Sequence, residues 1–121
     1  MLEELRGKVN EFGEACVEIS FTHTDKSCRF LIDTGFNGSL CIPRKTAEEL
    51  NLKVEEQTTF YGVGDHQAEI DIAYTEINWF SETAEVSVLV NEGEDFLLGT
   101  ALLENKELYI NFKTREVLIS N

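Results

Sequence analysis

Apolar residues recur at every second position in the early part of the chain. Val17, Ile19 and Phe21 are spaced two residues apart and would share one face of an extended segment. This period is typical of a strand that buries one side, and the strand expected here spans residues 15–22. The next apolar run ends at Ile32, and its unbroken Phe-Leu-Ile sequence predicts a strand buried on both faces.

Residues 53–80 are interpreted as one long hairpin with a glycine-bearing turn at its tip. In its second arm the apolar side chains change sides, because Ile72 falls on one face of the strand and Ile77 on the other. A strand that changes its buried face needs a bulge, which we expect near Thr75–Glu76.

The rest of the chain predicts further short elements. Pro43 marks one helix start, because the N–H that proline lacks is not needed in the first turn. Thr100 is a candidate N-cap for a second helix. Expected strands cover residues 28–32, 39–42, 84–90, 108–112 and 117–120, expected helices cover residues 44–52 and 101–105, and residues 81–83 form a loop. Residues 1–10 are consistent with a short helical turn or a loose arm. Together these patterns predict a mainly β, single domain over residues 1–121, with one or two short helices.

Acidic residues outnumber basic ones. Ten lysines and arginines stand against 23 aspartates and glutamates, which gives a net charge of −13 over 121 residues. Nucleic acids and anionic membranes are bound through clustered positive charge, so this balance argues against both as partners. No apolar run approaches the ~18 residues that a membrane-spanning helix needs, and the N-terminus has no hydrophobic segment of signal-peptide type.

The three cysteines are widely spaced. Cys16, Cys28 and Cys41 form no Cys-x-x-Cys pair, so they indicate reduced thiols in a cytoplasmic protein. Together with His23 and His66 they match none of the usual zinc-ligand spacings, and we expect no metal and no cofactor. Cys41 lies between apolar neighbours, which favours an inert buried thiol over a nucleophile.

Two familiar binding motifs are matched only in part. Gly62 and Gly64 lack the third glycine and the following helix of a dinucleotide site. A calcium loop that started at Asp33 would place Arg44 at its twelfth position, where the cation needs a bidentate glutamate. Neither a dinucleotide nor calcium is therefore expected.

The tripeptide Asp33-Thr34-Gly35 follows the apolar strand directly. A carboxylate at the end of a buried strand is costly to desolvate, so it usually has a partner or a function. The same residue types are common in turns, and a simple turn is the alternative.

Four features occur in a fixed order along the chain. They are the apolar strand that ends in Asp33, the hairpin over residues 53–80, the run Leu97-Leu98-Gly99 and the short helix after it. In this order, and through the segments Phe30–Gly38 and Leu97–Leu103, the chain resembles the retropepsin-like aspartic proteases. The similarity is greatest to the small single-domain microbial members, and it includes the closing hairpin of the chain.

The resemblance implies a retropepsin-like closed β-barrel that supplies one half of an acid-protease active site. Asp33 would be the catalytic residue, acting on a peptide or protein substrate. Because the chain carries one such motif, the second carboxylate would come from a second copy in a homodimer. The resemblance assigns active-site support to Thr34, Gly35, Leu97, Leu98 and Gly99, and assigns substrate binding in the cleft and in a flap over residues 53–80 to Phe36, Tyr61, Gly62, Val63 and Gly64.

A second interpretation is a retropepsin-fold module that dimerises or binds peptide with little or no proteolysis. The acidic surface and the bulky Phe36, where many retroviral members carry alanine, support this alternative. The complete Asp-Thr-Gly motif favours the enzyme. Retroviral members build a dimer sheet from chain termini, and residues 1–10 and 117–121 are the candidates here, although their sequence carries no signal for it.

Overall fold

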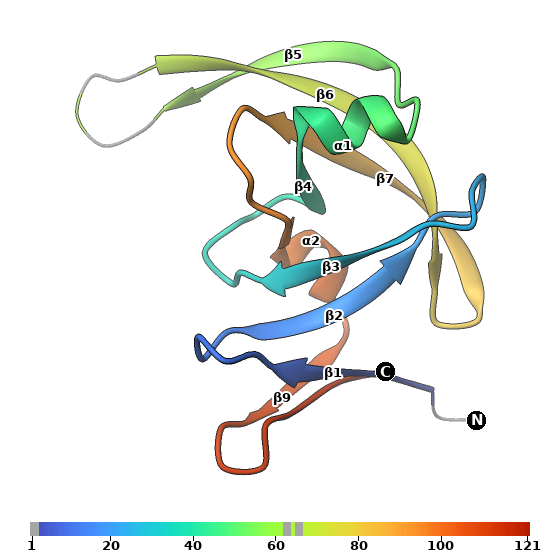
Figure 1. The fold of residues 1–121 in the computed structure, drawn as a ribbon, viewed down its shortest axis with the longest axis vertical. Coiled ribbons are helices and arrows are strands. Elements are labelled where there is room, and N and C mark those ends of the chain that lie inside the picture. Colours follow the sequence, from blue (N-terminus) through green and yellow to red (C-terminus); the bar gives the residue numbers. More distant parts are fainter. Residues whose placement is uncertain (1–2, 62–63, 65–66) are drawn as a thin grey trace.

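The strands of the protein form one strongly curled sheet (Figure 1). The computed structural model describes residues 3–61, 64 and 67–121. This part of the chain contains ten strands in the order β5-β6-β7-β4-β8-β3-β2-β1-β10-β9, and two short helices. The strands are β1 (Glu4–Val9), β2 (Ala15–Ser20), β3 (Ser27–Ile32), β4 (Leu40–Pro43), β5 (Val54–Tyr61), β6 (Gln67–Trp79), β7 (Glu82–Asn91), β8 (Leu97–Leu98), β9 (Glu107–Asn111) and β10 (Glu116–Ser120). The helices are α1 (Arg44–Glu49) and α2 (Thr100–Leu103). The mainly β fold expected from the sequence is confirmed.

The hairpin of β2 and β3 follows the predicted alternation. Val17 of β2 is 1% exposed, and Phe30 of β3 is fully buried. Leu31 remains half-buried, so burial on both faces of β3 is only partial. Phe21, just after β2, forms an isolated antiparallel bridge with Ile77 of β6, which folds the sheet over its own core.

The core lies inside this curl. Its largest fully buried side chains come from strands throughout the chain; they are Val17, Ile19, Phe21, Phe30, Leu40, Ile42, Ile77, Val88, Leu98, Val117 and Ile119. Leu40 and Leu98 belong to the strands that flank the segment carrying Asp33, so the candidate site rests directly on the core.

Residues 4–9, where the sequence indicated a helical turn or an arm, form a strand. β1 pairs with β10 along most of its length and with β2 at Lys8 and Val9. Charged residues alternate with small or apolar ones in this segment, which is a strand signal that its high charge obscured. Gly7 permits a close approach, because a Cβ there would lie 2.0 Å from the carbonyl oxygen of Cys16.

β5 and β6 form a long antiparallel hairpin, but the expected bulge near Thr75–Glu76 is wrong. The pairing of β6 with β7 is unbroken through this point, and the irregularity lies instead between Val54 and Glu56 of β5. Buried and exposed residues alternate in β6 only from Ala73 onward, without a change of buried face. Its two ends differ in surroundings: Ile77 is buried in the body, whereas Ile72, on the opposite face, is half-buried where the hairpin projects.

The connection from β6 to β7 is a two-residue turn rather than a loop over residues 81–83. Phe80 and Ser81 have positive φ angles of 52° and 60°, and Trp79 pairs with Glu82. Two such residues are typical of a type I′ hairpin turn, which asparagine and glycine usually mark. Because neither occurs here, the sequence carried no clear signal for the turn.

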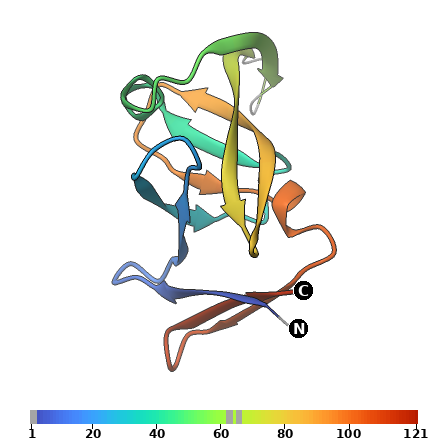
Figure 2. The same ribbon diagram turned by 90° about the vertical axis from the view of Figure 1, so that its right-hand side faces the viewer.

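The projecting hairpin and the terminal strands lie at opposite ends of the molecule in both views (Figures 1 and 2). β5 and β6 are at the top, and β1, β9 and β10 are at the bottom. Within the described residues, no helix has the length and apolar character needed to cross a membrane.

Candidate active site

Asp33 stands where β3 ends. Its backbone N–H donates to the carbonyl oxygen of Leu98 at 2.9 Å, and the N–H of Leu31 donates to that of Phe96 at 2.8 Å. β8 thus pairs in parallel with the end of β3 and antiparallel with β4 on its other side. Asp33 is a half-buried residue and directly follows Ile32, the last residue of β3.

The side chain of Asp33 is oriented by the turn that follows it. The N–H of Gly35 donates to Asp33 Oδ1 at 2.9 Å, and the N–H of Phe36 donates to the Asp33 carbonyl oxygen at 3.1 Å. A Cβ on Gly35 would lie 3.3 Å from Oδ1, which is a tight contact. The turn interpretation of this tripeptide is therefore correct, and the turn fixes one carboxylate oxygen. Among the described residues no hydrogen-bond donor is found for the other oxygen, Oδ2.

The segment that contains β8 and the start of α2 holds the far side of the loop. The Phe36 carbonyl oxygen accepts hydrogen bonds from the N–H of Thr100 at 2.8 Å and from its Oγ1 at 3.3 Å. Ser39 accepts one from the N–H of Gly99 at 2.9 Å. Thr100 is the first helical residue and Gly99 the N-cap, so the predicted capping role of the Thr100 side chain is wrong.

Gly99 lies closer to this loop than any other residue type could. A Cβ at this position would be 2.1 Å from the carbonyl oxygen of Gly38 and 2.6 Å from that of Phe36. The Phe36 ring also lies against Gly38, because a Cβ on Gly38 would be 2.6 Å from the ring. These two glycines therefore let the loop, the ring and the β8–α2 segment pack together.

The remaining predicted site residues lie in the Asp33 loop and in the β5–β6 hairpin. Thr34 is exposed at the surface of the protomer. In the hairpin, Tyr61 ends β5 opposite Gln67, and Gly64 is a turn residue with φ +80°. Gly62 and Val63 lie outside the described residues.

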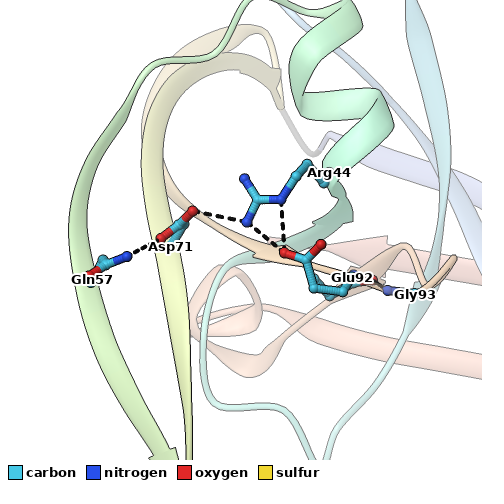
Figure 3. A network of polar contacts seen from close by, with 6 residues as sticks. Arg44, Gln57, Asp71, Glu92 and Gly93 are labelled. Carbon is cyan, nitrogen blue, oxygen red and sulfur yellow. Dashed lines mark hydrogen bonds and ion pairs between the residues drawn. The ribbon is translucent and has the colours of Figure 1, made fainter.

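An ion-pair network joins the base of the β5–β6 hairpin to the body (Figure 3). Arg44, at the start of α1, donates from Nη2 to Asp71 Oδ2 at 2.9 Å, and from Nε and Nη2 to Glu92 Oε1 at 2.8 and 2.6 Å. Gln57 of β5 donates to Asp71 Oδ1 at 2.7 Å. The network was missed by sequence reasoning, because its members are far apart in the chain and follow no local pattern.

These contacts shift the acidity of the groups involved. The hydrogen bond from Gln57, followed by that from Arg44, lowers the pKa of Asp71 below its ordinary value of 3.8. The hydrogen bond from Arg44 likewise lowers the pKa of Glu92 from 4.5. Both carboxylates therefore stay charged and bound to Arg44 at neutral pH.

Two of the thiols and histidines considered from the sequence, Cys41 and His23, make polar contacts, and His66 lies outside the described residues. Asn91 Nδ2 donates to Cys41 Sγ at 3.2 Å, and burial raises the pKa of the Cys41 thiol. His23 Nε2 lies 3.0 Å from the carbonyl oxygen of Leu50. In the part of the chain that the structure describes, no cluster of three or more histidine, cysteine or acidic side chains is arranged to hold a metal ion.

The comparisons with known proteins agree with this geometry. The sequence profile of the aspartyl protease family matches residues 19–102, which include the Asp33 loop, the hairpin, β8 and most of α2. A comparison with curated proteins found no match.

Solved structures with a similar fold include cellular and viral proteases. A retropepsin-like aspartic protease from Rickettsia conorii aligns over 99% of this chain and 92% of its own, with a TM-score of 0.73 and 15% identity. EIAV protease in complex with the inhibitor HBY-793 aligns over 79% and 90%, with a TM-score of 0.61 and 18% identity. The protease of simian foamy virus (mac) aligns over 74% and 91%, with a TM-score of 0.55 and 16% identity. At these identities the likeness concerns the fold.

Proposed function

Because the chain belongs to the retropepsin-like aspartyl proteases, we propose that it is an aspartic endopeptidase active as a homodimer. The observation that carries this proposal is the placement of Asp33 at the end of β3. One carboxylate oxygen is held by the N–H of Gly35, and the loop around it is fastened to β8 and α2. A carboxylate oriented in this way by its own turn is what general acid–base catalysis needs.

Peptide hydrolysis by this chemistry needs two carboxylates. Asp33 and its symmetry mate lie about 3 Å apart, where both cannot be ionised, so the pair shares one proton; aspartic proteases are the standard example of this arrangement. The ionised member takes a proton from a water molecule, which attacks the scissile carbonyl carbon. The protonated member donates a hydrogen bond to the carbonyl oxygen and stabilises the charge that develops there.

The surrounding elements have supporting roles. Thr34 is exposed in the protomer and bonds across the dimer to the opposite loop, which keeps the two carboxylates in register. The β5–β6 hairpin is a flap that closes over an extended peptide and excludes water, with Tyr61 and Gly64 at the closing end. Gly99 and the leucines of β8 support the loop from behind and do not touch substrate.

The test compares the wild-type protein with Asp33→Asn on casein and on a peptide library between about pH 3 and 8. The matched control is Asp25→Asn, which changes an exposed aspartate in the turn between β2 and β3. We expect cleavage by the wild type and the control, and at least about a hundredfold less by Asp33→Asn, because the amide cannot act as a base.

The mass in solution is measured on the same samples. A stable dimer without cleavage at any pH would support a binding or dimerisation module instead. Cleavage that persists in Asp33→Asn, or full activity from a monomer, would contradict the mechanism, since a single Asp33 cannot form the pair.

A further inference from the structure

Four of the ten basic side chains line one cleft. The cleft has a volume of about 520 Å³ and is lined mainly by β1 and β2. Its charged lining residues are Arg6, Lys8, Arg29 and Arg115, together with the acidic Glu11 and Glu18. The lining therefore carries a net charge of +2, whereas the rest of the chain holds six basic and 21 acidic side chains, a net charge of −15. A positive cleft in so acidic a protein favours a negatively charged ligand.

The strand register explains why these charges gather. Arg29 of β3 is opposite Glu18 of β2. Lys8 of β1 is opposite Cys16 of β2, and Arg6 lies two residues before Lys8. Residues that are directly opposite, or two apart on one strand, share a face of the sheet. The three basic side chains therefore lie on one face, and all three are exposed there.

Two of the four cations have no carboxylate partner. Among the described residues no ion pair is found for Lys8 or Arg115, and Glu116, which is opposite Lys8 in the β1–β10 pairing, forms none with it. Arg6 and Arg29 each contact one glutamate, at 2.8 and 3.3 Å, but their side chains are 67% and 69% exposed. Exposed ion pairs are weak, so an incoming carboxylate can replace them.

The spread of the charges fits an extended ligand. Arg115 directly precedes β10, and Arg29 belongs to β3; the strands β10, β1, β2 and β3 are neighbours in this order. Three strand spacings separate the two arginines by about 14 Å. A single phosphate or carboxylate group cannot span this distance, whereas an extended peptide covers it with about four residues. Nucleic acid is disfavoured, because the acidic surface around the cleft repels its phosphates.

The cleft lies close to the candidate active site. Arg29 and Leu31 share a face of β3, and Asp33 is the next position in the same alternation. The distance from Arg29 to Asp33 along the strand is about 13 Å. In Figure 1 the turns that carry Glu11 and Arg115 lie on the same side of the molecule as the loop after β3. A peptide that passes Asp33 can therefore reach the cleft about four residues further on.

We propose that this cleft binds an acidic segment of the protein substrate, at least about four residues away from the bond that is cut. Carboxylates of the segment pair with Lys8 and Arg115 and replace the surface contacts of Arg6 and Arg29. The inference rests on the proposed function in that the bound chain is a substrate. The binding of an acidic peptide does not itself require proteolysis.

The first test measures the binding of fluorescein-labelled hexaglutamate by fluorescence anisotropy. The Asp33→Asn protein is used, so that the probe stays intact. We expect binding at low salt that weakens as the salt concentration rises, and none of labelled hexaglutamine at the same concentrations. The double variant Lys8→Gln, Arg115→Gly should raise the dissociation constant of hexaglutamate by at least about tenfold.

The matched control is Lys45→Gln, Lys53→Gln, which removes the same charge from exposed positions outside the cleft. We expect its dissociation constant to stay within about twofold of the parent protein. Arg115→Gly alone should raise the constant by at least about threefold, and glycine suits the φ of 66° at this position, so the test does not depend on the double variant. Equal weakening by both double variants, or no binding of hexaglutamate, would overturn the proposal.

The second test concerns cleavage. A peptide that the wild type cuts is extended by four glutamates, placed four residues from the cut bond at either end in separate peptides, and by four glutamines as the control. For one glutamate extension we expect a KM at least about fivefold lower than for the matching glutamine extension, with a similar kcat. The double variant at Lys8 and Arg115 should lose this difference.

The two tests separate this inference from the proposed function. Cleavage that depends on Asp33 but gains nothing from either glutamate extension would reject the inference and keep the function. Binding of hexaglutamate that requires Lys8 and Arg115, without cleavage of any peptide, would reject the function and the substrate assignment, and would keep the cleft as an acidic-peptide site.

Discussion

The backbone N–H of Asp33 donates a hydrogen bond to the carbonyl oxygen of Leu98 at 2.9 Å. This bond joins the two segments that carry the family resemblance, although they lie far apart in the sequence. Leu98 is fully buried, so the loop that bears the carboxylate is hydrogen-bonded directly to a core residue. Changes in the β8–α2 segment should therefore reach the site without touching the carboxylate.

Gly99→Ala tests how tightly this segment is fitted. The new methyl group would lie 2.1 Å from the carbonyl oxygen of Gly38. Backbone atoms cannot turn aside as a flexible side chain can, so we expect a loss of about 1–3 kcal/mol in the free energy of unfolding. Gly93→Ala is the control, since a Cβ there meets only Asn91 Oδ1 at 3.5 Å. Urea unfolding curves that match for the two variants would contradict the packing described here.

Local patterns predicted the strands that lie flat on the core. The alternation that ends at Phe21 and the unbroken run around Phe30 follow directly from burial, and both were recognisable. β1 was harder, because its inward positions are Leu5, Gly7 and Val9, and a glycine contributes no apolar signal. The turn at Phe80 was missed for a related reason: its positive φ is imposed by the strands on either side.

The candidate site was predictable in part. An apolar strand ending in Asp33, together with a second apolar run closed by Gly99, indicated the loop and its support. The Arg44 network could not be predicted, since its partners Asp71 and Glu92 meet Arg44 only after the hairpin has folded against α1. No local pattern distinguishes β9, an edge strand among the described residues, from β1 and β10, which lie inside the sheet.

Thr34→Ala tests the role of the exposed threonine. In the protomer this side chain is at the surface, so its loss should leave the melting temperature of a dilute, monomeric sample within about 2 °C of the wild type. In the dimer it should raise the dissociation constant and lower peptide cleavage at low enzyme concentration. Thr34→Ser keeps the hydroxyl and should restore both. Equal dimer dissociation constants for the wild type, Thr34→Ala and Thr34→Ser would refute a hydrogen bond from Thr34 across the dimer.

Thiol reactivity tests whether any cysteine acts as a nucleophile. Burial raises the pKa values of Cys16, Cys28 and Cys41 above their ordinary value of 9.0, so little thiolate is present at neutral pH. We expect labelling by an aromatic disulfide reagent at pH 8 to be at least about tenfold slower than in unfolded protein. Labelling should speed up as the pH rises. Loss of peptide cleavage upon rapid modification of Cys41 would instead point to thiol chemistry.

Ser81→Gly should stabilise the protein. Ser81 has a φ of 60° in the turn between β6 and β7, a conformation that costs glycine little. We expect a gain of about 0.5–1 kcal/mol, measured by urea unfolding. Ser87→Gly is the control, because Ser87 lies within the regular β6–β7 pairing. There the same change should destabilise the protein by a similar amount, about 0.5–1 kcal/mol.

Arg44→Met tests whether the ion pairs at the hairpin base position the flap. The change keeps the aliphatic stem but removes the bonds to Asp71 and Glu92, so amides of β5 should exchange hydrogen faster. Peptide cleavage should show a raised KM with a smaller change in kcat, because a looser flap weakens the hold on substrate. Lys45→Met, which removes an exposed charge from the same helix, is the matched control.

The pH dependence of this effect has a definite sign. The folded-state pKa values of Asp71 and Glu92 lie below their ordinary values of 3.8 and 4.5. The stability that these carboxylates contribute is therefore fully present above the ordinary values, and it is lost as the pH falls through the lowered ones. The difference in melting temperature between wild type and Arg44→Met should be constant from pH 6 to about pH 5 and shrink below pH 4. It should also shrink at 1 M salt, where exposed pairs are screened. A difference that stays constant on acidification would mean that Arg44 stabilises the hairpin by packing and that the ion pairs contribute little.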